Sequence, residues 1–127
     1  FEVCKSLADY VFLDCTSSLD DPLSVYGMAA ADKAVQLVTP DIRSAAYYAS
    51  FEKTYEQIKG KSIGVINITD KDLYLPVGEV KAGFSNAKYI LPYSMYLKQQ
   101  YITGELTQKI PDQKFSAVCR GIAGAVL

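Results

Sequence analysis

The sequence predicts an α/β fold with a mostly parallel sheet and flanking helices. Three observations lead to this prediction. Four short apolar runs lack the alternation of a half-exposed strand, which is typical of strands buried on both faces. The segments between these runs are about 18 to 22 residues long, which is enough for crossover helices. Apolar residues make up 50% and charged residues 21% of the chain, as in ordinary globular domains.

The length of 127 residues fits a single α/β domain over residues 1–127 with a hydrophobic core of its own. The chain begins with Phe1, inside a pattern that indicates the middle of a helix, and it ends on the apolar Leu127. Both ends look cut. We therefore expect the sequence to be a fragment of a longer protein.

The four apolar runs are rich in Val, Ile, Leu and Tyr, which favours strands. A short buried helix is the competing interpretation, but the length and the β-branched content of the runs argue against it. The predicted strands are Tyr10–Cys15, Ala34–Thr39, Ser62–Ile68 and Lys88–Tyr93.

Three further segments are predicted to be helical. The first is Asp41–Lys59, which Asp41 can cap and Gly60 can end. A short helix is expected within Leu75–Phe84, which contains two glycines. The third has the clearest period: apolar residues from Phe115 to Val126 recur at helical spacing over roughly 14 residues, and Asp112 is a candidate N-cap.

Composition excludes several classes of function. The chain has no histidine, so it contains no Ser-His-Asp or Cys-His catalytic site and no His-ligated metal. Three cysteines without C-x-x-C spacing fit reduced cytosolic thiols, and we expect a cytoplasmic protein. The net charge of −1 gives no nucleic-acid signature, and no apolar run approaches the length of a membrane span.

Polar residues follow the predicted strands at the edge where an open α/β sheet binds ligands. Asp14 ends the first run, and a carboxylate at such a strand tip can hold Mg²⁺ beside nucleotide phosphates, although a capping or solvated aspartate is the ordinary alternative. Asn67 ends the third run. Its amide can bond a base edge, but an Asx-turn is the commoner role. The fourth run ends in Pro92-Tyr93-Ser94.

The order of these motifs resembles the second half of a MinD/ParA-type P-loop ATPase. The resemblance rests on six segments, which follow in this order: Asp9–Pro22 (DYVFLDCTSSLDDP), Ala31-Asp32 with Val35–Pro40 (VQLVTP), Asn67, Ile90–Ser94 (ILPYS), Tyr101–Leu106 (YITGEL) and Phe115–Leu127. Together they extend over nearly the whole chain. The resemblance implies a partial P-loop NTPase domain, Rossmann-like and three-layered, of which this chain would be the C-terminal part.

The resemblance also implies a site for ATP and Mg²⁺ in the complete domain. In it, Asp14 would be the catalytic and metal-binding carboxylate, and Thr16 and Ser17 would respond to the γ-phosphate. Asn67 and the Pro92 backbone would hold adenine. The expected function is an ATP-dependent dimerisation switch, working as a homodimer, that positions or partitions a cellular cargo.

Two departures from the family pattern restrict this expectation. No G-x-x-x-x-G-K-[ST] motif occurs in these residues, so the phosphate-binding loop is missing and the chain is not expected to hydrolyse ATP alone. The loop after Asp14 also lacks the usual P-x-G. An inactive ATPase-like scaffold and a receiver-like signalling domain remain as alternatives, although the acidic cluster and late lysine of a receiver are not found.

Overall fold

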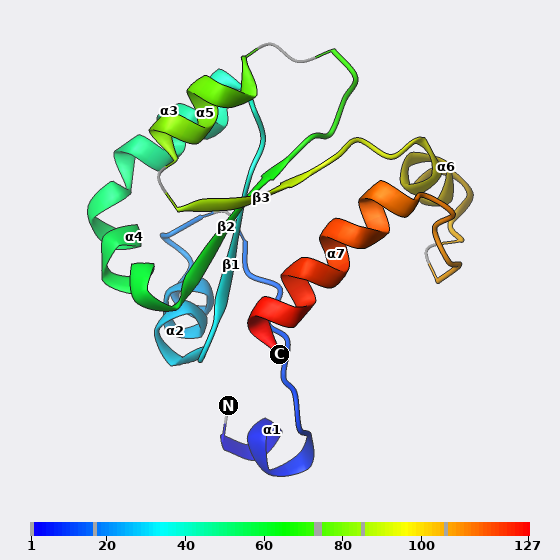
Figure 1. Cartoon of the computed structure of the whole chain (residues 1–127). Coiled ribbons are helices and arrows are strands. Elements are labelled where there is room, and N and C mark those ends of the chain that lie inside the picture. The colour runs from blue at the N-terminus through cyan, green and yellow to red at the C-terminus, as the bar shows by residue number, and fades with distance from the viewer. Residues whose placement is uncertain (1, 17, 73–74, 85, 106) are drawn as a thin grey trace. The chain divides into compact units, whose positions relative to one another are not determined.

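The structure, a computed structural model, describes residues 2–16, 18–72, 75–84, 86–105 and 107–127. By their internal contacts these residues divide into two compact units, Phe1–Asp32 and Lys33–Leu127. Each unit is described below by itself. The course of the chain can be followed by its colours in Figure 1.

The N-terminal unit contains two short helices, α1 (Glu2–Leu7) and α2 (Pro22–Ala30). The strand expected over Tyr10–Cys15 is wrong, because residues 10–16 have no regular secondary structure. A strand needs a neighbouring backbone to pair with, and the described part of this unit contains no strand. The apolar run is therefore an extended connection between α1 and α2.

The C-terminal unit is built on a three-stranded parallel sheet with the order β1-β2-β3. Its strands are β1 (Ala34–Val38), β2 (Ser62–Asn67) and β3 (Ala87–Leu91). All three lie within or beside the predicted runs, and their parallel pairing confirms an α/β fold with a parallel sheet and flanking helices. β2 is the central strand, and five of its six residues are buried.

The helical segment between β1 and β2 is divided where the sequence predicts one helix, and the short helix expected within Leu75–Phe84 is present as α5 (Val77–Gly83). In place of one helix over Asp41–Lys59 there are α3 (Ile42–Ser50), α4 (Glu52–Ile58) and the 3-10 turn η1 (Lys59–Lys61). The break is at Phe51, whose N–H bonds the carbonyl only three residues back. The other helices are α6 (Met95–Thr103) and α7 (Gln113–Val126).

One face of the sheet packs against α3 and α5. Ile66 of β2 is fully buried there beside Val80 and Phe84, and Tyr48 of α3 closes the cluster. The rings of Tyr48 and Phe84 meet edge to face with their centroids 4.6 Å apart. α3, α4 and α5 lie together on one side of the strands in Figure 1, and α7 lies on the other.

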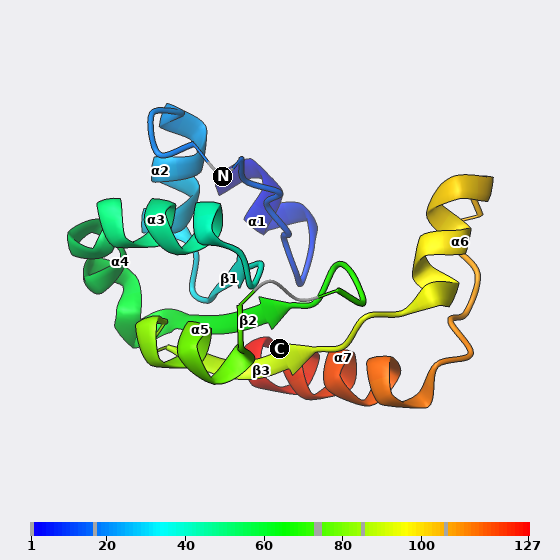
Figure 2. The same ribbon diagram turned by 90° about the horizontal axis from the view of Figure 1, so that it is seen from above.

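α7 covers the opposite face at β3. It begins at the predicted N-cap Asp112, whose carboxylate accepts a hydrogen bond from Phe115 N–H at 3.0 Å. The Tyr89 hydroxyl of β3 donates to the carbonyl of Gly121 in α7 at 2.9 Å. Figure 2 shows α7 running along β3. The helix predicted from apolar period is therefore confirmed, together with its cap.

β1 is an outer strand of the described sheet and is less well covered than β2. Its residues alternate between half-buried and exposed, and Val35 and Leu37 are 42% and 63% exposed. None of the helices in the described residues is long and apolar enough to cross a bilayer.

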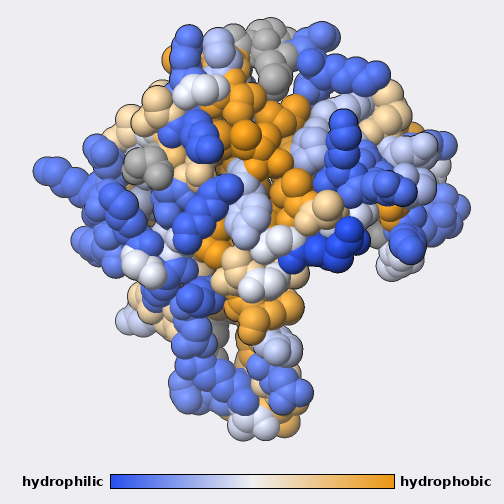
Figure 3. Space-filling model, in the orientation of Figure 1, coloured by the Kyte–Doolittle hydropathy of each residue, from blue (hydrophilic) through white to orange (hydrophobic). Residues whose placement is uncertain are grey.

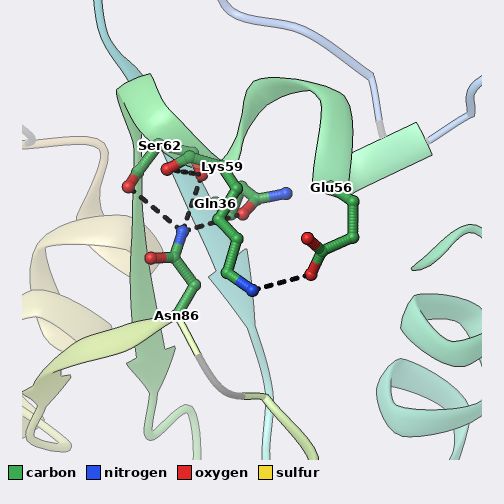
Figure 4. A network of polar contacts seen from close by, with 5 residues as sticks. All are labelled: Gln36, Glu56, Lys59, Ser62 and Asn86. Atoms are coloured by element: carbon green, nitrogen blue, oxygen red, sulfur yellow. Dashed lines mark hydrogen bonds and ion pairs between the residues drawn. The ribbon is translucent and has the colours of Figure 1, made fainter. Parts of the chain in front are cut away.

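A polar network joins the three strands near their amino ends, as Figure 4 shows. The amide nitrogen of Asn86, just before β3, donates to the hydroxyl of Ser62 at 2.6 Å and to its carbonyl at 3.1 Å. It also lies 3.5 Å from the side-chain oxygen of Gln36 on β1. Lys59 pairs nearby with Glu56 at 2.8 Å. This network fixes the start of β3 against β2.

Candidate functional site

Two predicted site residues meet at the carboxyl edge of the sheet. Asn67 is the last residue of β2, and its register partner is Leu91, the last residue of β3. The ladder continues one step further, since Ile68 N–H donates to the Leu91 carbonyl at 2.9 Å. Pro92 follows directly. Asn67 and Pro92 thus lie on adjacent strand ends, as the sequence predicts from the rule that parallel strands share a carboxyl edge.

The side chain of Asn67 has no hydrogen-bond partner among the described residues. Asn67 is half-buried, and its amide forms no hydrogen bond with any described residue. An asparagine in an Asx-turn would instead bond the backbone two residues on. No such bond is found for Asn67 among the described residues. Within them, its donor and acceptor have no hydrogen-bond partner.

An aromatic ring and a cation lie beside these residues. Tyr93, half-buried after Pro92, has the ammonium of Lys71 5.9 Å from its ring centroid. The Tyr93 hydroxyl lies 3.6 Å from the sulfur of Met95. Ser94 then caps α6. Sequence reasoning did not single out Lys71, although a lone basic residue in the loop after a predicted strand was a signal that could have identified it.

The polar residues that follow β1 have a structural role, because they cap helix α3. The carboxylate of Asp41 accepts hydrogen bonds from the N–H groups of Arg43 and Ser44, both at 2.9 Å, and caps α3. The hydroxyl of Thr39 also donates to it. These bonds, the Thr39 hydroxyl first, hold the pKa of Asp41 below its usual value. The predicted cap is confirmed.

Asp14, the predicted catalytic and metal-binding residue, belongs to the N-terminal unit. It is exposed, within the irregular segment between α1 and α2. The residues on either side of it approach α2 closely: a methyl group added at Gly27 would lie 3.2 Å from the Cys15 sulfur and 3.3 Å from Leu13. This packing fixes the backbone around Asp14 while leaving its carboxylate in solvent.

Thr16 is tied to the start of α2. Its N–H donates to the Ser24 hydroxyl at 3.0 Å, and the two hydroxyl oxygens are 3.2 Å apart. Ser24 in turn donates its hydroxyl and its N–H to the carboxylate of Asp21, the N-cap. The Ser24 hydroxyl is the main cause of the lowered pKa of Asp21. Ser17, the other predicted γ-phosphate residue, lies outside the described residues.

The resemblance implies Mg²⁺ at Asp14. In the described part of the chain, no three His, Cys, Asp or Glu side chains come together as a metal-binding group. A single exposed carboxylate does fit Mg²⁺ in one arrangement, where waters and nucleotide phosphates complete the coordination. Asp14 has the required oxygen donor and exposure.

A cavity of about 220 Å³ lies away from the predicted residues, between α6 and the chain that follows it. Gln100 lines it, and its side-chain nitrogen donates to the carbonyl of Gln108 at 2.9 Å. The side-chain oxygen of Gln100 is buried without a partner among the described residues. The bond from the side-chain nitrogen therefore ties α6 to the chain that follows it.

The surface at the carboxyl edge of the sheet presents both apolar and polar groups. Figure 3 shows apolar surface gathered in the upper middle of the face, around the carboxyl ends of the strands. Ligand sites usually combine such apolar walls with a few polar groups that fix orientation. Here the polar groups are Asn67 and Lys71, and Tyr93 supplies an aromatic ring.

Neither a family model, nor a curated protein, nor a solved structure matches this chain. The functional assignment therefore depends on the geometry above and on the motifs of the sequence.

Proposed function

We propose that this chain is the C-terminal portion of a MinD/ParA-like ATPase, and that the carboxyl edge of its sheet holds the adenine of ATP. One observation carries the proposal: Asn67, whose amide has no partner among the described residues, lies beside the Pro92 backbone at the ends of adjacent parallel strands. An amide that both donates and accepts can pair with the edge of adenine, and the Pro92 loop can lie against the base.

The other residues have supporting roles in the proposed cycle. Asp14 would hold Mg²⁺, which supplies charge neutralisation for phosphoryl transfer when bound. Thr16 and Ser17 would respond to the presence of the γ-phosphate. In the complete protein, nucleotide binding would favour a homodimer, and hydrolysis would release it, so that the cargo is positioned by cycles of association.

The chain by itself is not expected to turn over ATP. Phosphoryl transfer depends on positioning and charge stabilisation, which in this class come largely from the P-loop and its lysine. That motif does not occur in these 127 residues. The base-binding half of the site can nevertheless be tested separately.

The test is a titration of the ¹⁵N-labelled chain with adenosine, guanosine and uridine, followed by amide chemical shifts. We expect adenosine to bind with a dissociation constant of about 1–10 mM, and to shift the amides of Asn67, Leu91 and Tyr93 selectively. Removing the amide in Asn67→Ala should weaken adenosine binding about tenfold. Gln57→Ala, which removes an exposed amide on α4, is the matched control.

Two results would refute the proposal. The first is the absence of localised shifts with adenosine up to about 20 mM, where even weak base recognition is detectable. The second is that adenosine, guanosine and uridine bind equally well and that Asn67→Ala leaves this binding unchanged. The Asn67 amide would then not recognise a base.

One observation favours the second candidate, an inactive ATPase-like scaffold. The hydroxyl of Thr16 already contacts Ser24, and Ser24 is held by the helix cap Asp21. A residue that responds to phosphate has to leave such contacts. If Thr16→Val lowers the free energy of unfolding by about 1 kcal/mol, as expected for a lost structural hydrogen bond, and adenosine does not bind, the scaffold is the better assignment.

A further inference from the structure

A nucleotide at the carboxyl edge brings negative charge that needs a cationic partner. Phosphate oxygens are recognised by charge-assisted hydrogen bonds from lysine or arginine, or by the amides of a glycine-rich loop. The glycine-rich loop is not part of this sequence. Within this chain, the partner for a phosphate therefore has to come from another element.

In a parallel sheet, a cation just before a strand lies near the amino edge, and a cation just after a strand lies near the carboxyl edge. The cations that precede β1 or β2 lie toward the amino edge: Lys33, Lys59 and Lys61. The first described cation after each strand is Arg43 after β1, Lys71 after β2, and Lys98 after β3. These three are nearest along the chain to the carboxyl edge, where a ligand of an open α/β sheet binds.

Two of these three are less suited to the task. Arg43 lies beside the carboxylate of Asp41, whose pKa its charge helps to lower. Lys98 lies further along the chain from its strand, because it is the fourth residue of α6, one turn beyond the cap. Lys71 is only four residues after Asn67, in the loop that leaves β2.

The surroundings of Lys71 hold its ammonium near the site without neutralising it. The ammonium is placed over the ring of Tyr93, 5.9 Å from the centroid. It forms no ion pair with any described acidic residue. The neighbouring carboxylate of Asp70 accepts a hydrogen bond from the backbone N–H of Lys71 at 2.6 Å, so that carboxylate is turned toward the backbone.

We infer that Lys71 is the phosphate-contacting residue of the base site, and that it makes the site prefer a nucleotide to a nucleoside. This inference rests on the proposed function, because it needs a base held between Asn67 and the Pro92 loop. Tyr93 acts as a positioning residue that keeps the long lysine side chain at the edge of the sheet. Part of the entropy that Lys71 loses on binding is then lost before the ligand arrives.

The test compares adenosine with adenosine 5′-monophosphate, which differ by one phosphate. With the unmodified chain, we expect the monophosphate to bind about five- to tenfold more tightly at low ionic strength. The advantage should shrink as salt is added, since an exposed charge pair is screened. Lys71→Met keeps the stem and its contact with the ring but removes the charge, and should bring both ligands to the affinity of adenosine. Lys81→Met on α5 is the control.

The outcomes separate the two proposals. If adenosine binds but Lys71→Met leaves the preference for the monophosphate intact, or if the unmodified chain shows no preference, the role of Lys71 is refuted and the adenine site stands. If neither ligand binds, the proposed function fails and this inference fails with it. Amide spectra of each variant confirm that the exposed substitution leaves the fold unchanged.

Discussion

Gly64 occupies the position where β2 and the chain entering β3 come closest. Its N–H donates to the Asn86 carbonyl at 2.9 Å. A methyl group added there would lie 2.6 Å from that carbonyl oxygen and 2.8 Å from the ring of Phe84. The pairing register between β2 and β3 shifts at the same place, between Gly64 and Val65. Only glycine permits this approach, and the sequence contains no signal for it beyond a glycine within an apolar run.

We predict that Gly64→Ala lowers the free energy of unfolding by about 3 kcal/mol, because either the backbone of Asn86 or the ring of Phe84 has to move. Gly124→Ala is the control: it lies in α7 with open space around it, and should stabilise the protein by about 0.5–1 kcal/mol. Urea unfolding measures both. A midpoint for Gly64→Ala equal to that of the unmodified chain would contradict the close approach.

At the scale of elements, several helices and strands could be predicted from the sequence, and β1, β2 and α7 show why. β1 and β2 lie in short apolar runs bounded by turn residues. α7 has a continuous apolar period and a capping aspartate before it. In each case the local pattern and the tertiary environment favour the same structure, which is when sequence reasoning succeeds.

Three features of the fold either depend on contacts that a local pattern does not contain or were missed. Tyr10–Cys15 has the composition of a strand but no pairing partner in its own unit. The interruption at Phe51 has neither glycine nor proline to announce it, and accompanies the stacking of Tyr48 on Tyr55. α6 was not predicted, although Ser94 and Gly104 are ordinary capping residues at its two ends.

The cap of α3 gives a prediction for the whole helix. Because the pKa of Asp41 is lowered in the folded state, its contribution is fully present above the unfolded value of about 3.9 and is lost as the pH falls through the folded value. We expect Asp41→Ala to cost about 1 kcal/mol at pH 7 and distinctly less at pH 3. Asp9→Asn, an exposed carboxylate, should change stability little at either pH. A cost for Asp41→Ala that does not depend on pH would show that the carboxylate is not the cap.

For the whole molecule, the burial pattern predicts a gradient of local stability. Val65 and Ile66 of β2 have no exposed surface, and β2 pairs with a strand on each side. α1 contains no buried residue. We expect amide hydrogen exchange to be slowest in β2, at a rate set by global unfolding, and fast in α1. If the amides of α1 were protected from exchange as strongly as those of β2, the prediction that the two units differ in stability would be wrong.

The candidate site could be predicted in the C-terminal unit for the same reason that its sheet could. Once β2 and β3 are parallel neighbours, Asn67 and Pro92 must share an edge. The Lys71–Tyr93 pair was not predicted because it depends on the path of a loop. The roles of Asp14 and Thr16 stay predictions, since they need the nucleotide and the complete domain.

The half-covered outer strand β1 has a practical consequence for anyone handling the purified chain. Among the described residues of the C-terminal unit, β1 pairs with a strand on one side only, and its Val35 and Leu37 are exposed. Such an edge is a template on which further copies can add strand by strand. The charged Asp32 and Lys33, immediately before β1, oppose such growth. Concentrated samples should therefore gain solubility from a further charge within the strand, such as Leu37→Lys.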